Sequence, residues 1–330
     1  MPNAMNVNVR TMKYFVTGCA GFIGSQLCER LLQQGEEVFG LDCFTDYYSP
    51  ARKKRNLSAI CKHPNFTFIE GDILSTNLMP LLAQSDCVFH TAGQPGVRGS
   101  WGKQFDLYTK NNVLATQRLL ESIKESEQSI RVVYSSSSSV YGNTDQLPTS
   151  ETAVPRPYSP YGATKLTAEH LCMLYHDNYN IPVVSLRYFT VYGPRQRPDM
   201  AFNIFIKAML NDDPITVLGD GQQTRDFTFV QDIITANIAA SHLPVEGKIF
   251  NLGGGTRISL AGVIQKLEKV MGVKANIEHR EKNRGDVRDT WADTKQARKY
   301  LDYQPETNLD EGLAQQVAWE KAVLSGEEFA

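Results

Sequence analysis

The chain has 330 residues, of which 42% are hydrophobic and 21% are charged, and its formal net charge is −2 at pH 7. This length allows one large domain or two with a sizeable core, and the composition is that of a globular protein. The small net charge gives no bulk attraction to nucleic acid or to an anionic membrane surface.

Targeting and redox signals are weak. No apolar run approaches the length of a membrane span, and residues 1–11 lack the apolar segment of a secretory signal. The six cysteines form no CxxC pair and no cluster with metal-ligand spacing. We therefore expect a cytoplasmic protein with reduced thiols, without a metal and without a nucleic-acid or membrane partner.

Short apolar runs alternate with helical patterns in the first part of the chain. Helical spacing of apolar residues is found in segments 24–35, 114–126 and 168–179. Six apolar runs predict buried strands: 13–17, 37–41, 66–70, 87–91, 131–135 and 183–188. This alternation predicts an α/β protein with a doubly wound parallel sheet, a Rossmann fold, with helices on both faces.

The pattern changes after about residue 193, where proline, glycine and charge increase and the elements become short. We expect residues 1–193 to form the Rossmann domain. Residues 194–330 are expected to form mainly a smaller α/β lobe that is interwoven with the first domain.

The first expected turn is rich in glycine. Residues 14–24 read YFVTGCAGFIG, with three glycines spaced G-x-x-G-x-x-G between a strand and a helix. Glycine allows a pyrophosphate to approach the turn closely, and the free N–H groups of the helix N-terminus favour an anion. The candidate cofactor contacts in this turn are Gly18, Gly21, Phe22, Ile23 and Gly24.

Two acidic residues follow the next strands. Asp42 ends the second expected strand, 18 residues beyond Gly24, where a carboxylate accepts the ribose hydroxyls of adenosine. Because this carboxylate would repel a 2′-phosphate, NAD is favoured over NADP. Asp72 and Ile73 end the third expected strand and are candidates to flank the adenine. An ordinary α/β turn that binds no phosphate is the alternative interpretation.

A Tyr-Lys pair is the candidate acid–base unit. Tyr161 and Lys165 in SPYGATKLTAEH lie at i and i+4, on one face of a helix. A free tyrosine, with a pKa of about 10, is a poor base at neutral pH, but a nearby ammonium favours the phenolate. Such a tyrosine could take a proton from a substrate hydroxyl while hydride leaves the carbon. The alternative is an ordinary pair on a helix surface.

Five serines stand in a row at 135–139, within RVVYSSSSSVYGN. A serine run usually indicates a flexible linker, but the flanking valines and tyrosines favour a strand. The serines then lie at the C-terminal end of a buried strand, the edge where doubly wound folds bind their ligands.

These stretches together resemble the extended short-chain dehydrogenase/reductase family over nearly the whole chain. The matching motifs are TGCAGFIG (17–24), HTAGQ (90–94), YSSSSSVYG (134–142), YGATK (161–165), RYFTVYGP (187–194) and RDFTFVQD (225–232). Within the family the chain is most similar to nucleotide-sugar 4-epimerases, in particular to those that act on UDP-glucuronate. The segments that indicate this branch are 42–50, 93–101 and 189–202.

The resemblance implies a cofactor, a set of catalytic residues and a reaction. The cofactor is NAD, and the resemblance adds further cofactor contacts at Thr91, Ala92, Tyr161, Lys165 and Tyr188. Ser137 would hydrogen-bond the 4-hydroxyl of the sugar, with Ser138 and Ser139 near enough to share that contact. Tyr161 would remove the hydroxyl proton, with Lys165 as its partner. Hydride passes to NAD and returns to the opposite face of the 4-keto sugar, which inverts the centre.

The serine run also separates this chain from other branches of the family. The 4,6-dehydratases carry an acid pair before VYG, and UDP-glucuronate decarboxylases typically carry a glutamate there, where this chain has Ser139. The resemblance therefore implies conversion of UDP-glucuronate to UDP-galacturonate. A UDP-glucose or UDP-N-acetylhexosamine 4-epimerase and a UDP-glucuronate decarboxylase remain alternatives. A non-catalytic NAD-binding scaffold or redox sensor is the alternative from another class.

A glucuronate oxidised at C4 is a β-keto acid and tends to lose CO₂, so an epimerase must hold the carboxylate. Arg197 is the candidate cation because a guanidinium binds carboxylates bidentately, and Arg98 and Arg195 compete for this role. Thr190 stands where many relatives have asparagine, and its hydroxyl could also bind the carboxylate.

The resemblance also assigns contacts in the C-terminal lobe. Thr216 and Val217 would lie beside the uracil, Arg225 on the diphosphate and Asp286 on the uridine ribose, whereas Arg284 replaces a usual proline. For Arg225 and Asp286 the alternative is an ordinary surface ion pair. Members of the family usually form homodimers through two helices, here about 105–125 and 162–180, and the expected role is the supply of precursors for surface polysaccharides.

Overall fold

The computed structural model describes residues 10–281 and 285–326, so Arg284 lies outside the described residues. Within this part of the chain, the central sheet has seven parallel strands in the order β11-β6-β5-β4-β1-β2-β3. The bounds of these strands are β1 (Lys13–Thr17), β2 (Glu37–Asp42), β3 (Phe66–Glu70), β4 (Cys87–His90), β5 (Arg131–Ser137), β6 (Val183–Tyr188) and β11 (Lys248–Leu252).

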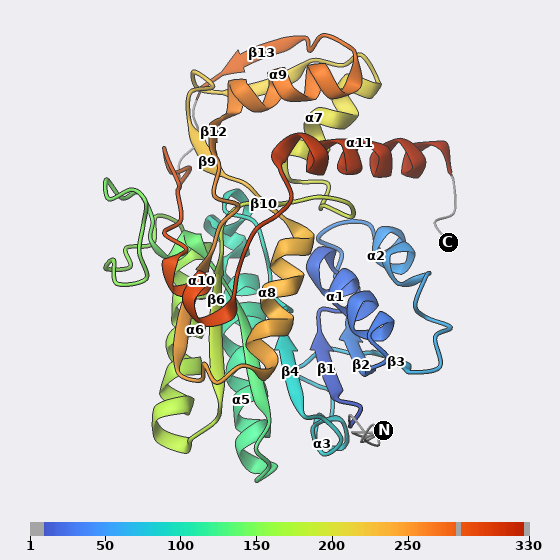
Figure 1. Ribbon diagram of the computed structural model, residues 1–330, viewed down its shortest axis with the longest axis vertical. Coiled ribbons are helices and arrows are strands. Elements are labelled where there is room, and N and C mark those ends of the chain that lie inside the picture. The colour runs from blue at the N-terminus through green and yellow to red at the C-terminus, as the bar shows by residue number, and fades with distance from the viewer. Residues whose placement is uncertain (1–9, 282–284, 327–330) are drawn as a thin grey trace, which may run out of the picture.

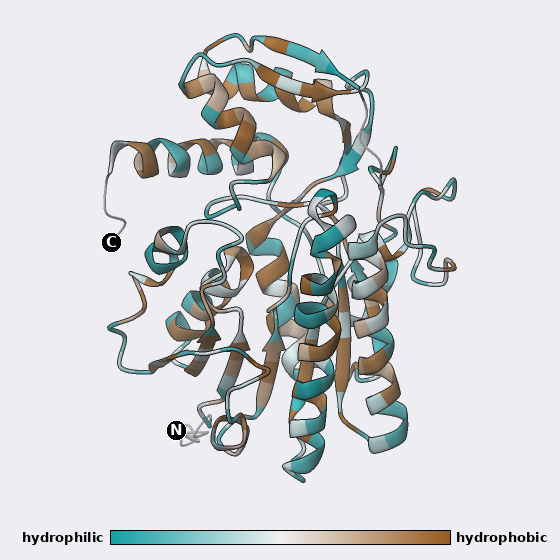
Figure 2. Ribbon diagram, turned by 180° about the vertical axis from the view of Figure 1, so that it is seen from behind, coloured by the Kyte–Doolittle hydropathy of each residue, from teal (hydrophilic) through white to brown (hydrophobic). Residues whose placement is uncertain are grey.

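Helices cover both faces of this sheet. On one face pack α1 (Phe22–Gln33) and α8 (Val230–His242), with α2 (Pro50–Leu57) beside α1, as Figure 1 shows. On the other face lie α3 (Met79–Leu82), α4 (Phe105–Tyr108), the π-helix η3 (Thr109–Leu114), α5 (Ala115–Glu125) and α6 (Pro160–Tyr179), which are nearer the viewer in Figure 2. The predicted doubly wound α/β fold is therefore confirmed.

Side chains alternate between the two faces of the strands and so build two cores. In β1, Tyr14 and Val16 join the core under α1 and α8, whereas Phe15 joins the core under α5 and α6. Because the central strands are buried on both faces, they appear in the sequence as continuous apolar runs.

The C-terminal lobe lies above the carboxyl ends of the sheet strands (Figure 1). Its helices are α7 (Ala201–Leu210), α9 (Leu260–Met271) and α11 (Leu309–Ser325). Three strand pairs belong to this end of the molecule: β7 (Val191–Tyr192) with β10 (Thr228–Phe229), β8 (Ile215–Leu218) with β13 (Ile277–Arg280), and β9 (Thr224–Asp226) with β12 (Arg257–Ser259). Short 3-10 helices lie at Arg98–Ser100, Gly102–Gln104 and Ser138–Val140.

The six predicted strands form β1 to β6, but β11 was not predicted. After the chain has built part of the upper lobe, α8 and β11 return to the Rossmann unit, and α10 (Lys295–Leu301) packs against both. The sheet thus takes its seventh strand from beyond residue 193, and the domain boundary at 193/194 stays a prediction.

Candidate functional site

A cleft opens at the carboxyl ends of the sheet strands, and its walls come from the loops after β1, β2, β3 and β4 together with β5 and α6. Every residue predicted to contact a cofactor lines this one cleft. These residues are Gly18, Gly21, Phe22, Ile23, Gly24, Asp42, Asp72, Ile73, Thr91, Ala92, Tyr161, Lys165 and Tyr188.

The glycine turn joins β1 to α1 tightly. Gly18 has a φ of +72°, which favours glycine, and a Cβ atom there would lie 2.8 Å from the backbone of Ala92. A Cβ atom at Gly24 would lie 2.3 Å from the carbonyl oxygen of Gly18, so the helix packs directly on the turn. Within the described residues, no side chain caps α1 at Gly21 and its first turn holds no acidic residue. The N–H groups of this turn are therefore available to an anion, which is what a dinucleotide pyrophosphate requires.

Asp42 is fixed at the end of β2 by three donors. Its Oδ1 accepts hydrogen bonds from the Phe44 N–H at 2.8 Å and from Lys53 Nζ at 3.0 Å, and its Oδ2 accepts one from the Ala20 N–H at 3.2 Å. Lys53 also lines the cleft but was missed, because nothing in the sequence links a lysine of α2 to the end of β2. These contacts orient the carboxylate without a ligand.

The first turn of α6 presents Tyr161 to the cleft. Pro160 begins this helix, and the Ser159 hydroxyl caps it by accepting the Gly162 N–H at 3.1 Å. Burial raises the pKa of Tyr161, whereas a hydrogen bond with Ser137 and the charge of Arg197 act in the opposite direction. In this structure, the positive charge that lowers the pKa of Tyr161 thus belongs to Arg197.

Lys165 lies one turn further along α6 and is buried. Burial lowers the pKa of its ammonium to about 8, and Nζ lies 4.4 Å from the centre of the Tyr134 ring. Its predicted help to the Tyr161 phenolate stays a prediction.

The serines of the run differ in their surroundings. Ser135 and Ser136 line the cleft, and their hydroxyls are engaged by Tyr188 at 3.0 Å and by Glu169 at 2.6 Å, respectively. Ser137 ends β5, accepts the Ser139 N–H at 3.1 Å and reaches Tyr161. Ser138 and Ser139 follow, half-buried, in a 3-10 turn. The run is thus ordered strand and turn, and Ser137 is the serine next to the candidate base.

Arg197 is the one of the three candidate carboxylate-binding arginines that lines the cleft. It already forms a bidentate ion pair with Asp199, at 3.0 and 3.1 Å. Arg195 pairs instead with Glu29 of α1 at 2.7 Å and does not line this cleft.

Arg98, which begins the 3-10 helix at Arg98–Ser100, belongs to a second cluster with Arg225 of β9 and the segment around Asp286. It pairs with Asp286 at 3.2 Å. Arg225 donates to the carbonyl oxygens of Thr224, Val287 and Arg288 at 2.8 to 2.9 Å. The structure therefore brings three predicted substrate contacts together, although Arg225 is largely engaged by main-chain carbonyls.

Three other predicted substrate contacts lie apart from the cleft lining. Thr216 and Val217 are in β8, where Val217 is buried and Thr216 half-buried. Thr190 is half-buried between β6 and β7, and its carbonyl oxygen accepts the Thr228 N–H at 2.9 Å.

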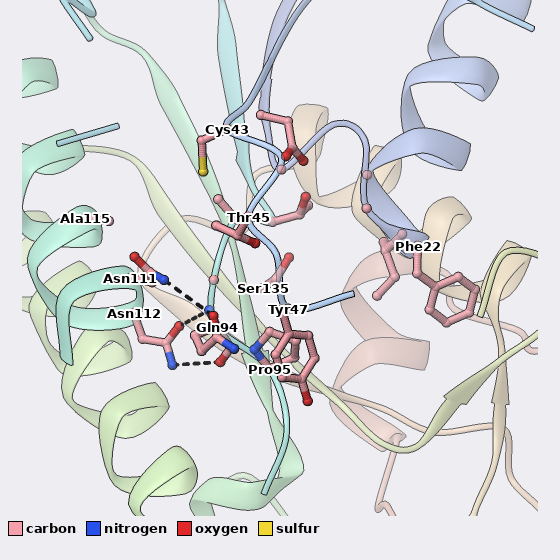
Figure 3. Close-up of a pocket in the computed structure, with 18 of the residues that line it drawn as sticks. Phe22, Cys43, Thr45, Tyr47, Gln94, Pro95, Asn111, Asn112, Ala115 and Ser135 are labelled. Carbon is pink, nitrogen blue, oxygen red and sulfur yellow. Dashed lines mark hydrogen bonds between the residues drawn. The ribbon is translucent and has the colours of Figure 1, made fainter. Parts of the chain in front are cut away.

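Several lining residues carried no signal in the sequence. Figure 3 shows Asn111 and Asn112 reaching Gln94 from one wall of the cleft. Asn112 Oδ1 accepts the Gln94 N–H at 2.6 Å, and its Nδ2 donates to the Gln94 carbonyl oxygen and to Thr164 Oγ1. Both asparagines sit in the π-helix η3, a distortion common at functional sites, but TKNNVL looks like ordinary helix in the sequence.

Within residues 10–281 and 285–326, no helix is long and apolar enough to cross a membrane. In the same residues, no group of three or more His, Cys, Asp or Glu side chains could hold a metal ion.

Comparison with known proteins gives consistent matches over most of the chain. The NAD dependent epimerase/dehydratase family matches residues 14–253. A Bacillus subtilis protein named an uncharacterized UDP-glucose epimerase is 45% identical, over 96% of this chain and 100% of that protein. A UDP-glucuronate 4-epimerase of Thermodesulfobacterium geofontis is 39% identical, over 93% of this chain and 96% of its own length.

A solved structure matches equally well. The crystal structure of UDP-glucuronic acid 4-epimerase from Bacillus cereus, in complex with UDP-glucuronic acid and NAD, is similar with a TM-score of 0.92 and 45% identity. The similarity covers 94% of this chain and 100% of that one.

Proposed function

The chain belongs to the NAD dependent epimerase/dehydratase family, and on this premise we propose that it is an NAD-dependent UDP-sugar 4-epimerase that converts UDP-glucuronate to UDP-galacturonate. The observation that carries the proposal is the single cleft that joins a dinucleotide turn to Tyr161 and Arg197. The turn provides a cofactor site, Tyr161 a base and Arg197 a cation for the carboxylate.

The cofactor end of the cleft is built by the glycine turn and Asp42. The uncapped first turn of α1 binds the pyrophosphate, and Asp42, already oriented by Lys53, accepts the ribose hydroxyls. NAD, when bound, supplies the hydride acceptor and donor at C4 of the sugar.

The reacting end is built by β5 and α6. Tyr161 takes the proton of the 4-hydroxyl and later returns it, and Ser137 hydrogen-bonds Tyr161 and the same hydroxyl. Arg197 holds the carboxylate so that CO₂ is not lost. The run from Ser135 to Ser139 contains no acid that could assist elimination of water, which favours epimerisation over dehydration.

Product analysis tests this proposal. We expect the NAD-loaded protein to convert UDP-glucuronate to UDP-galacturonate without release of CO₂, as measured by chromatography and mass spectrometry. Formation of UDP-xylose or a pentos-4-ulose would show a decarboxylase instead. Tyr161→Phe is the control: it should retain NAD and lose turnover by a factor of about 10² to 10⁴.

The assembly and the cellular role are further parts of the proposal. We infer a cytoplasmic homodimer that supplies precursors for surface polysaccharides. The helices at 105–125 and 162–180 present the exposed side chains of Leu114 and Leu174, which are 50% and 54% exposed and are compatible with a partner. Light scattering should give a particle mass of twice the 36.9 kDa chain mass. The Leu174→Glu variant should have the mass of a single chain.

A further inference from the structure

The guanidinium of Arg197, which lines the cleft, forms an ion pair with the neighbouring carboxylate of Asp199. Its Nε lies 3.0 Å from Asp199 Oδ1 and its Nη2 lies 3.1 Å from Asp199 Oδ2. This is the bidentate geometry by which arginine binds any carboxylate. One edge of the guanidinium is therefore already used within the protein.

Asp199 has a second hydrogen-bond partner, Tyr47. The Tyr47 hydroxyl donates to Asp199 Oδ2 at 3.1 Å and so links the loop after β2 to the loop after β7. Burial alone would raise the pKa of Asp199, but Arg197 and Tyr47 outweigh it and the pKa is lowered. Asp199 is thus an ionised carboxylate at neutral pH beside the cleft.

A second carboxylate that approaches Arg197 meets this negative charge. It must either displace Asp199 from the Nε edge or bind the remaining edge with an ionised carboxylate close by. The side chains of Arg197 and Asp199 are 21% and 35% exposed, so water screens this site only in part, and two carboxylates held close together there repel each other. A neutral hydroxymethyl group accepts a hydrogen bond from Arg197 without this cost.

We propose that Asp199 is a specificity-determining residue that competes with the substrate carboxylate for Arg197 and thereby narrows the preference for an acidic over a neutral sugar. Tyr47 adds one hydrogen bond to Asp199, but the ion pair with Arg197 does not depend on it. This inference rests on the proposed function, because it assumes that a UDP-sugar binds with its C6 group near Arg197.

Binding measurements on a slow variant test the competition directly. Calorimetry gives the Kd of UDP-glucuronate and the Kd of UDP-glucose for two NAD-loaded proteins. One carries Tyr161→Phe alone, and the other carries Tyr161→Phe together with Asp199→Asn. We expect Asp199→Asn to lower the Kd of UDP-glucuronate by about 10-fold and to change the Kd of UDP-glucose by less than about 2-fold. Asp199→Ser, which also removes the charge, should act in the same direction.

Tyr47→Phe is the matched control. It removes one hydrogen bond to Asp199 but leaves the ion pair with Arg197, so the ratio of the two Kd values should move by less than about 3-fold. The inference is wrong if Asp199→Asn or Asp199→Ser raises the Kd of UDP-glucuronate, or changes the Kd values of both ligands by the same factor. Asp199 would then orient Arg197 instead of competing for it.

The two proposals fail in different ways. If the wild-type protein forms UDP-galacturonate but the ratio of Kd values is unchanged in Asp199→Asn, only the role of Asp199 is lost. If the wild-type protein does not convert UDP-glucuronate, the proposed function is lost, whereas the ratio of Kd values still reports on Asp199.

Discussion

At the scale of single residues, His90 is a buried imidazole that directly precedes the cleft residue Thr91. Its ring lies between two threonines, with Nδ1 2.8 Å from Thr17 Oγ1 and Nε2 2.9 Å from Thr116 Oγ1. Burial, and then the charge of Lys165, lowers the pKa of His90 to about 3 from an ordinary value of 6.5. The folded protein therefore holds this imidazole in its neutral form at neutral pH.

The buried His90 predicts a pH dependence of stability. Below pH 6.5 the unfolded chain binds a proton here that the folded protein does not bind until about pH 3, so acid favours unfolding. We expect this site to remove about 1.4 kcal/mol of stability per pH unit on acidification below pH 6.5. Denaturant unfolding at several pH values should show a shallower loss in His90→Gln than in the wild type. Equal slopes in the two proteins would contradict the prediction.

At the scale of elements, α6 sets the position of the reacting groups. The apolar pattern alone indicates helix over 168–179, and the Tyr161–Lys165 spacing and the family resemblance extend the expected helix to about 162–180. In the structure the helix begins at Pro160. The first two turns carry Tyr161 and Lys165 on the cleft side, where apolar periodicity is absent, so only the Ser-Pro pair at 159 and 160 could have marked the start.

The cap of α6 can be compared with a matching cap elsewhere. Ser159 and Ser259 both begin a helix, and each accepts the N–H of a glycine three residues later at 3.1 Å. Replacement of either serine by alanine should cost about 1 kcal/mol of stability. Only Ser159→Ala should also lower kcat, because it loosens the turn that holds Tyr161. Equal kcat values in the two variants would show that the cap does not position the base.

A buried ion pair ties α6 to β6. Arg187 contacts both oxygens of Glu169, at 2.5 and 3.0 Å, and Glu169 also accepts the hydroxyl of Ser136. Arg187→Met should destabilise the protein by about 3 to 5 kcal/mol, because it leaves a buried charge without its partner. The double variant with Glu169→Leu should be more stable than Arg187→Met alone. Additive losses in thermal unfolding would mean that the pair is not coupled.

The same elements show what a sequence reveals and what it conceals. The glycine turn, Asp42 and Tyr161 were predictable because each sits at a fixed offset from the end of a strand or the start of a helix. Lys53 was not predictable, because its partner Asp42 is brought to it by folding and not by sequence spacing. Asp199 lies only two residues from Arg197, but nothing in the sequence shows that its carboxylate turns back onto that guanidinium.

At the scale of the whole molecule, the two predicted domains share one core. The cluster under α1 and α8 contains Val184 of β6, Ile233 of α8 and Leu252 of β11, and it continues to Val263 and Val317 in the upper lobe. Apolar residues on both sides of position 193 therefore bury one another. The lobe is not a separate unit placed on a complete Rossmann domain.

This shared core predicts that the first domain cannot fold alone. A fragment of residues 1–193 loses α8 and β11, so the part of the sheet face that α8 covers is exposed and β6 becomes an unprotected edge. We expect the fragment to aggregate or to show no cooperative thermal transition by circular dichroism. Co-expression with residues 194–330 should restore a soluble complex, because the two pieces together contain the whole core. A soluble fragment that unfolds cooperatively and binds NAD by itself would show that the missing helix and strand are dispensable, and the boundary at 193 would then separate two independent domains.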